Sequence, residues 1–384
     1  MNQLYRALHM PPGRLLKKLS GHKEIYTIAV RPRPAVEGAT PLPALGGKPY
    51  TPLPEVPGYW YADPMLYHRD GHRWLFCEAF DLATGKGSIA AWEFDGPQPH
   101  TPHIVLEEPY HLSFPTIFDW NGETWMIPET SANHSFNLYR CTACPGGWEK
   151  VLELDVGREL CDTIVLDANE NTLALLCSET DPENQLLVRY RRYLLRVDAA
   201  GFTLDEDEPY NLQHRAFDYV SRNAGPLFRQ DRQLVHATQV STKVDYGVYL
   251  QFYVLRAASE VPLCAATPQN VVIDGIDPKD IVGIHSYVRD GEVEIIDARY
   301  LKKLPHIPAA QHHGAAADST GDGEIPEGVA DPPTEPAVPV PAAPQDEPTE
   351  ESAVWDDLMD SVREQRKITA LPTGNTDDKQ EGSC

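Results

Sequence analysis

The feature that most constrains how this chain folds is an internal repeat with a period of about 50 to 60 residues. Each copy is a strand of small and apolar residues, then a tight turn, then a second apolar strand. The five copies occupy residues 63–81, 113–131, 161–179, 222–240 and 282–300. Asn-Gly or Asp-Gly at three of the turns supplies the positive φ angles that a two-residue hairpin needs. A period of this length in an all-β chain indicates a propeller with four strands per repeat, so five repeats predict five blades.

The expected fold class is therefore all-β, a five-bladed β-propeller over residues 24–304. Residues 24–33 alternate like a strand and precede the first repeat. We expect this segment to complete the last blade and close the ring. Residues 1–23 are expected to form a short basic N-terminal arm or helix.

The C-terminal segment 305–384 is Pro/Glu-rich, with 17 Asp/Glu against 4 Lys/Arg. Such a composition buries too little apolar surface to offset the entropy of ordering, so a disordered acidic tail is expected from about Pro308. Within it, residues 352–367 carry apolar side chains around Trp355 at helical spacing. This short helix is either inconsequential or a docking site for a protein partner.

The charge of the chain excludes some partners. A formal net charge of −24 argues against nucleic acid, whose phosphates need a basic surface. The N-terminus lacks the apolar stretch of a signal peptide, and seven irregularly spaced cysteines do not form a disulfide pattern. We therefore expect a cytoplasmic protein. Peripheral membrane contact is expected through cations of residues 1–20, namely Arg6, Arg14, Lys17 and Lys18.

A propeller brings the first strand of every blade to a central funnel, so residues far apart in sequence are expected around one mouth. These are Asp63 from blade one, Ser113 from blade two, Asp162 from blade three, Arg222 and Asn223 from blade four, and His285 from blade five. Glu129 follows the second strand of blade two, after Pro128. Glu78 and Asp81 occupy the similar place in blade one.

Several of these stretches also carry a family resemblance: "WYADPMLY", "EEPYHLSFPTIF", "MIPETSAN", "SRNAG" and "GIHSYVRDGEVEIIDAR". The chain resembles, over about residues 24–302, the N-terminal domain of plant glucosamine inositolphosphorylceramide transferases and its stand-alone bacterial relatives. That domain is similar to the propellers of glycoside hydrolase families 32, 43 and 68. The resemblance implies a glycan-related role. Nothing here resembles the separate sugar-transfer domain of the plant enzymes.

The resemblance also implies roles for acidic residues, because glycosidases place two carboxyls beside the bond that they cleave. Asp63 corresponds to the first-blade aspartate of these hydrolases. Ser113 stands where they have a second aspartate, and Asp162 or Glu179 stands near their blade-three acid. Glu129 is an alternative acid from blade two. We take Asp63, Glu129 and Asp162 as candidate catalytic residues, against the alternative that they cap turns or pair with Arg222.

Other candidates would bind the sugar rather than react with it. Trp60 and Tyr61 offer ring faces for stacking, with packing between blades as the alternative. Arg222 would suit an anionic group or an ion pair. His111, Asn133 and His285 would donate or accept hydrogen bonds near the mouth, with structural roles as the alternative.

No metal site or cofactor is expected. The lone Cys141–Cys144 pair is typical of a hairpin loop, and "ATGKGS" lacks the spacing of a phosphate loop. The sequence thus favours a carbohydrate-active propeller, linked to polysaccharide or glycoconjugate biosynthesis, that binds a glycan or glycolipid sugar in its funnel. Paired carboxylates suggest glycosidase or transglycosidase chemistry. The alternative is a non-catalytic glycan-binding or scaffold propeller in a glycan-assembly complex.

Overall fold

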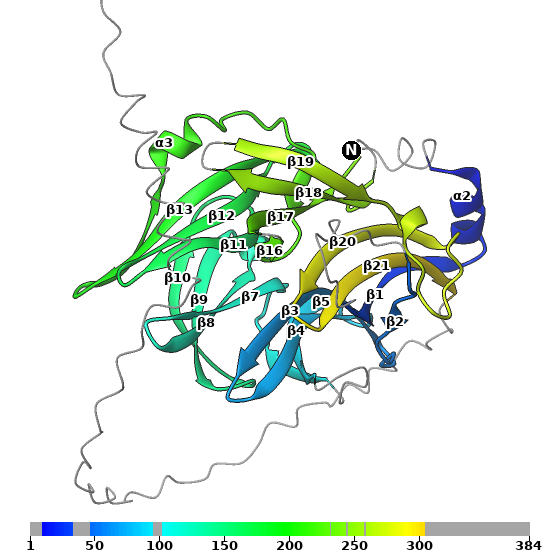
Figure 1. Ribbon diagram of the computed structural model, residues 1–384, viewed down its shortest axis with the longest axis horizontal. Helices are drawn as coiled ribbons and strands as arrows, with labels where there is room; N and C mark the ends of the chain where they lie inside the picture. The colour runs from blue at the N-terminus through cyan, green and yellow to red at the C-terminus, as the bar shows by residue number, and fades with distance from the viewer. Residues whose placement is uncertain are drawn as a thin grey trace, which may run out of the picture. The chain divides into compact units, whose positions relative to one another are not determined.

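The computed structural model describes residues 10–33, 47–94, 102–230, 232–242, 245–256 and 259–303. These residues form five antiparallel sheets that follow one another around a ring (Figure 1). The predicted all-β class and the five blades are therefore confirmed. The tail from residue 304 onward, with its expected disorder and its candidate helix at 352–367, lies outside the described residues.

Each blade starts with one of the predicted hairpins and adds outer strands to it. Blade one is β3 (Tyr59–Arg69), β4 (His72–Asp81), β5 (Lys86–Glu93) and β6 (His103–Leu106). Blade two is β7 (Ser113–Trp120), β8 (Glu123–Glu129), β9 (Ser135–Ala143) and β10 (Gly147–Asp155). Blade three is β11 (Leu160–Asn169), β12 (Thr172–Thr180), β13 (Val188–Asp198) and β14 (Gly201–Glu206). Blade four is β15 (Ser221–Asn223), β16 (Phe228–Gln230), β17 (Gln233–Val240), β18 (Tyr249–Arg256) and β19 (Ser259–Ala266).

Blade five is built from both ends of the propeller. It contains β20 (Ile281–Arg289) and β21 (Val293–Lys303), followed by β1 (His22–Pro32) and β2 (Thr51–Pro52). β1 pairs antiparallel with β21 along its whole length, with Ile28 opposite Asp297. The predicted closure by the segment 24–33 is confirmed. It holds the ring together because the first and last strands share one ladder of hydrogen bonds.

The core is divided among the contacts between neighbouring blades rather than gathered in one place. For example, Ile28 and Ile295 of blade five pack with Leu75 and Trp92 of blade one. Leu138 of blade two packs with blade three in the same way. Strands that are buried on both faces explain why the repeats read as continuous apolar runs.

The first strands share an irregularity that shapes the centre of the ring. Pairing with the second strand slips between Ala62 and Met65 in blade one, and at the matching places in blades two, three and five. Asp63, Phe114 and Asp162 lie in these bulges with φ angles of 52°, 44° and 49°. Such left-handed angles are uncommon for residues other than glycine, and clusters of them mark functional sites. The position in blade two that matches Asp63 and Asp162 is therefore Phe114 and not Ser113.

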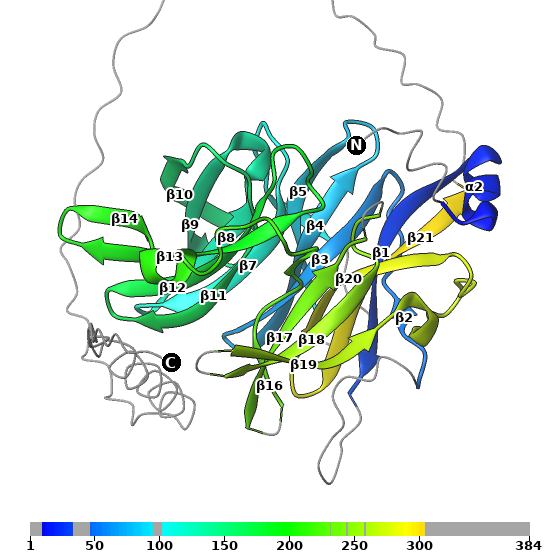
Figure 2. The same cartoon turned by 90° about the horizontal axis from the view of Figure 1, so that it is seen from above.

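The arm contains the helix α2 (Pro12–Leu19), which packs beside β1 and β21 (Figure 2). Its cations contact acids of the propeller: Arg14 pairs with Glu24 and Asp245, Lys17 with Asp280, and Lys18 with Glu24. Three of the four cations expected at a membrane are thus engaged with the protein itself, and Arg6 lies outside the described residues. The described helices include none that is long and apolar enough to span a membrane.

Candidate functional site

Asp63 joins three blades at the centre of the ring. Its Oδ2 accepts a hydrogen bond from the backbone N–H of Phe114 at 3.3 Å, and its Oδ1 accepts one from Ser286 Oγ at 3.0 Å. Its own backbone N–H donates to Asp297 Oδ2 at 2.9 Å. The bulge makes this possible because it turns the carboxylate of Asp63 away from its own sheet and toward blades two and five.

Glu129 and Asp162 continue these contacts from blade two to blade four. The backbone N–H of Asp162 donates to Glu129 Oε2 at 3.2 Å. Asn223 Nδ2 donates to the Asp162 carbonyl at 2.7 Å, and Gln239 Nε2 donates to Asp162 Oδ2 at 3.2 Å. The structure thus links Glu129, Asp162 and Asn223 by hydrogen bonds. Asp63 is beside them because it accepts from Phe114, the neighbour of Ser113, which pairs with Glu129.

His285 completes the ring from blade five, together with an acid that the sequence reasoning missed. Its Nδ1 lies 2.7 Å from Asp297 Oδ2 and 3.6 Å from Asp63 Oδ1. Asp297 Oδ1 also accepts from the backbone N–H groups of His285 and Ser286. Asp297 lies in the "IIDAR" segment, across the predicted hairpin from His285, and the register of that hairpin is the signal that could have revealed it.

The same three residues could also hold a metal ion. Ligand atoms of Asp63, His285 and Asp297 all lie within 4.8 Å of one another, and all three residues are buried. The contacts in the structure account for the cluster without an ion, because His285 Nδ1 pairs with the Asp297 carboxylate, which raises the pKa of His285. A cation would have to displace that pair.

Burial and neighbouring charges shift the pKa values of the central acids. It raises the pKa of Asp63 to about 6, with nearby Asp297 adding to the rise and His285 opposing it. Burial and then the negative charge of Glu129 raise the pKa of Asp162 well above its usual range. For Asp297 burial is again the largest single cause and raises the pKa, but His285 and the backbone donors together outweigh it, so the pKa is lowered. The site therefore combines carboxyls of different proton affinity.

Glu78 and Glu129 are equivalent by strand register. Glu78 pairs with Ala62, the last residue before the bulge of blade one, and Glu129 pairs with Ser113 before the bulge of blade two. Burial, then Asp63 and other acids, raise the pKa of Glu78 well above its usual range. The expectation that Glu78 corresponds to Glu129 is thus supported.

An arc of aromatic side chains accompanies the acids. Trp60 stacks on Phe80, with ring centroids 4.4 Å apart and an interplanar angle of 9°. Tyr26 lies 5.0 Å from Trp60 and 4.6 Å from the ring of His285. Phe80 in turn lies 6.1 Å from His111. Tyr26 and Phe80 were not singled out from the sequence, because nothing local distinguishes them from core aromatics.

Three other residues that were predicted to bind the sugar make contacts elsewhere in the protein. Tyr61 packs against Trp92 in the core between blades, so the alternative interpretation of packing holds for it. Asp81 accepts from the backbone N–H of Ala83 in an exposed turn, and Asn133 is exposed and donates to Ser135 Oγ. These contacts give all three residues structural roles.

Ser113, His111 and Arg222 remain beside the ring. Ser113 is buried opposite Glu129. His111 Nε2 lies 3.3 Å from Glu78 Oε1. Arg222 lies 3.8 Å from Asp162 Oδ2, and its guanidinium is 5.2 Å from the ring centre of Tyr246.

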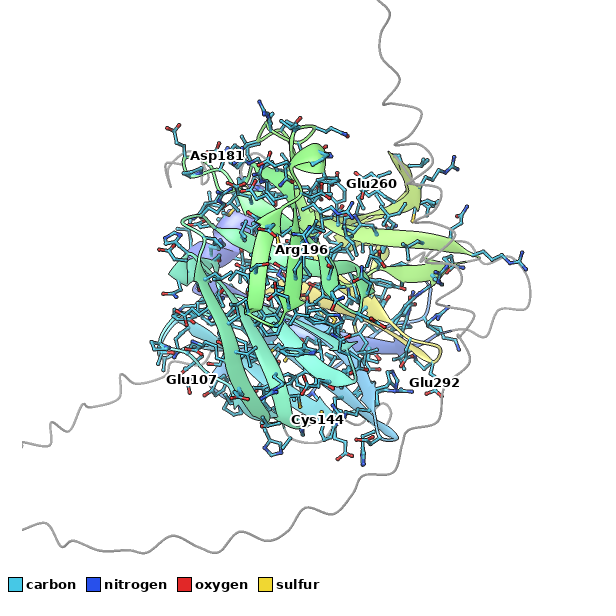
Figure 3. All side chains as sticks on the ribbon, turned by 90° about the vertical axis from the view of Figure 1, so that its left-hand side faces the viewer. Glu107, Cys144, Asp181, Arg196, Glu260 and Glu292 are labelled. Atoms are coloured by element: carbon cyan, nitrogen blue, oxygen red, sulfur yellow. The ribbon has the colours of Figure 1, made fainter. Side chains whose placement is uncertain are left out.

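Glu179 and Cys144 do not belong to the ring. Glu179 of blade three forms a two-point ion pair with Arg189. Cys144, labelled in Figure 3, lies in the turn between β9 and β10 and carries a free thiol, as expected of a hairpin loop.

Fold and site together define a five-bladed β-propeller with a central ring of buried carboxyls flanked by aromatic side chains. The family "Glucosamine inositolphosphorylceramide transferase 1, N-terminal" matches residues 53–261, and the chain belongs to this family. The resemblance noted in the sequence is confirmed.

Two relatives and two solved structures are similar to parts of this chain. A glucosamine inositolphosphorylceramide transferase 1 of Arabidopsis thaliana is 40% identical over 101 residues, which are 25% of this chain and 13% of that protein. One of Oryza sativa subsp. indica is 32% identical over 156 residues, 38% of this chain and 18% of that protein. The chain thus spans less than a fifth of the length of these relatives. The catalytic domain of a Coprinopsis cinerea GH62 α-L-arabinofuranosidase is similar with a TM-score of 0.42 and 12% identity, over 62% of this chain and 90% of that domain. An exo-β-1,3-galactanase of Phanerochaete chrysosporium is similar with a TM-score of 0.37 and 8% identity, over 54% of this chain and 51% of that protein.

Proposed function

We propose that this propeller binds a sugar unit of a glycan or glycolipid at its central ring. The observation that carries the proposal is that the stacked rings of Trp60 and Phe80 adjoin the buried carboxyls, through Tyr26 beside His285 and through His111 beside Glu78. Carboxylates accept hydrogen bonds from sugar hydroxyls, and aromatic faces pack against the C–H bonds of the sugar ring. The relatives are named as transferases of a glycolipid, which supports a role in glycoconjugate assembly.

The ring also suits chemistry at a glycosidic bond, which needs one carboxyl that is protonated and one that is ionised. Glu129 accepts from the Asp162 N–H, and Asp63 accepts from Phe114 next to Ser113, the strand partner of Glu129, so the three carboxyls are neighbours with different surroundings. Burial raises the pKa of Asp162 well above its usual range, whereas the Glu129 carboxylate accepts hydrogen bonds from Ser131 Oγ and the Asp162 N–H. We propose these three residues as the reactive set.

One observation favours the alternative of a binding or scaffold propeller without turnover. Phe114 occupies the blade-two position that matches Asp63 and Asp162. A propeller that bound sugar without cleaving it would need no carboxyl there.

Glu129→Gln distinguishes the two functions, because it keeps the shape of the side chain and removes its charge. Saturation-transfer NMR against a panel of mono- and disaccharides would identify a bound sugar, and incubation with the sugar that binds would reveal turnover. In an enzyme the variant should lose turnover by about 10²–10⁴-fold while binding persists. In a binding module only affinity should change.

Asp81→Asn is the matched control, since it removes one charge from an exposed turn of blade one. This variant should alter neither turnover nor sugar affinity. Absence of any sugar signal with the wild-type protein across the panel would contradict the proposal.

A further inference from the structure

Four carboxyls of the ring, those of Asp63, Glu78, Asp162 and Asp297, are buried, whereas that of Glu129 is half-buried, and the five differ in the donors that face them. Asp297 receives three backbone N–H groups and the His285 ring, and Asp63 receives Phe114 N–H and Ser286 Oγ. Glu129 receives Ser131 Oγ and Asp162 N–H, and Asp162 receives Gln239 Nε2 beside Arg222. Among the described residues, only the His111 ring faces Glu78 in this way. Glu78 is therefore the carboxyl least stabilised as an anion.

The surroundings of Glu78 show in detail that its carboxylate lacks hydrogen-bond donors. The residue is 5% exposed, and its Oε1 is buried without a hydrogen-bond partner of good geometry. The closest polar group is His111 Nε2 at 3.3 Å. A carboxylate that is taken out of water without donors is costly, and it escapes that cost by binding a proton.

Gly87 fixes the pair of Glu78 and His111. Its backbone N–H donates to His111 Nδ1 at 2.9 Å, so a neutral ring carries its proton on Nε2, toward Glu78. A side chain at this glycine would begin 2.8 Å from Glu78 Oε1 and 2.7 Å from His111 Cε1. The missing side chain is thus what lets the imidazole lie against the carboxyl.

We propose that Glu78 is the carboxyl of the ring that holds a proton and donates it to the bound sugar. The proposal rests on the sugar-binding function proposed above and names the donor of that site. The His111 ring, whose Nε2 lies 3.3 Å from Glu78 Oε1, limits where the carboxyl can point. The charged groups that face Glu78 are Asp63, Asp162 and Asp297 from β3, β11 and β21, and Glu129 from β8. Burial followed by these four acids raises the pKa of Glu78, and burial lowers the pKa of His111.

The chemistry of the donation balances within the ring. As the bond between the anomeric carbon and its leaving oxygen breaks, the Glu78 proton passes to that oxygen. A water or sugar hydroxyl forms the new bond to the anomeric carbon and loses its proton to ionised Asp63. In a binding module the same proton instead makes a hydrogen bond to a sugar oxygen, which the ionised acids cannot provide.

Infrared spectroscopy of protein labelled with ¹³C-glutamate tests the protonation directly. Wild-type protein at neutral pH should show the carbonyl band of a protonated, labelled carboxylic acid that shifts in D₂O. Glu78→Gln should remove this band. Glu129→Gln, the register-matched control, should leave it in place. A band that is absent from the wild type, that survives Glu78→Gln or that disappears in Glu129→Gln would overturn the proposal.

Two further measurements keep the test decisive. If Glu78→Gln does not fold, Glu78→Asp should also remove the labelled band, because aspartate carries no label, and an unchanged band would again overturn the assignment. Sugar binding is measured separately by saturation-transfer NMR on the same samples. A protonated Glu78 without any bound sugar in the panel would refute the proposed function and not the proton assignment.

Discussion

Asp297→Asn is the perturbation whose effect follows most directly from the structure. Each oxygen of Asp297 faces two donors: Oδ1 faces the N–H groups of His285 and Ser286, and Oδ2 faces the Asp63 N–H and the His285 ring. In either orientation the asparagine NH₂ group must point at two donors. Removing one member of a buried charged pair costs about 3–5 kcal/mol, so a loss of this size in the free energy of unfolding is expected.

Equilibrium urea unfolding, followed by tryptophan fluorescence and circular dichroism, measures this loss. Asp81→Asn is the control, because Asp81 accepts one bond in an exposed turn and its replacement should cost within about 0.5 kcal/mol. If Asp297→Asn cost less than about 1 kcal/mol, the charged pair would not stabilise the propeller and the reasoning would be refuted.

The pH dependence of the stability difference between wild type and Asp297→Asn tests the direction of the pKa shifts of Asp297 and His285. The pKa of Asp297 is lowered, so its contribution is lost as pH falls through that lowered value. The pKa of His285 is raised, because Asp297 and Asp63 outweigh burial, so its contribution is lost as pH rises through the raised value. The stability gap between wild type and Asp297→Asn should be widest between these limits and narrow on both sides. A gap that widens steadily in one direction would be inconsistent with the pair.

Three other outcomes follow from the structure. Sugar binding that uses ionised Asp63 should weaken as pH falls through about 6, and Asp63→Asn should remove this dependence in a calorimetric titration. Gly225→Ala should lower the melting temperature by several degrees, because a Cβ there would lie 2.3 Å from the Tyr287 carbonyl oxygen and the residue has a φ of +135°. Gly291→Ala is the control, since its Cβ would meet no atom within 4 Å and the melting temperature should change little. Trp60→Ala should weaken sugar binding by about 0.5–1.5 kcal/mol without unfolding the protein, and an unchanged affinity would remove the aromatic arc from the site.

The local signals of the chain were sufficient to predict its architecture. Asp70-Gly71 and Asn121-Gly122 adopt the positive φ angles that their sequences predict, because a two-residue turn depends on little beyond its own residues. The turn at Asp290 is made differently: its side chain accepts from the backbone N–H groups of Glu292 and Val293. The hairpin was still predicted correctly, since both solutions reverse the chain at the same place.

The sequence by itself therefore determined the repeat, the five hairpins and, through the funnel that they imply, the meeting of Asp63, Asp162 and His285. Only the tertiary structure decided which other residues join them. The bulge moved Phe114 into the place expected for Ser113, because one slipped residue changes which side chain points inward. The docking of α2 joined Arg14 to Asp245, 231 positions away. Such contacts depend on how strands from opposite ends of the chain are packed together, and no pattern within a single strand records them.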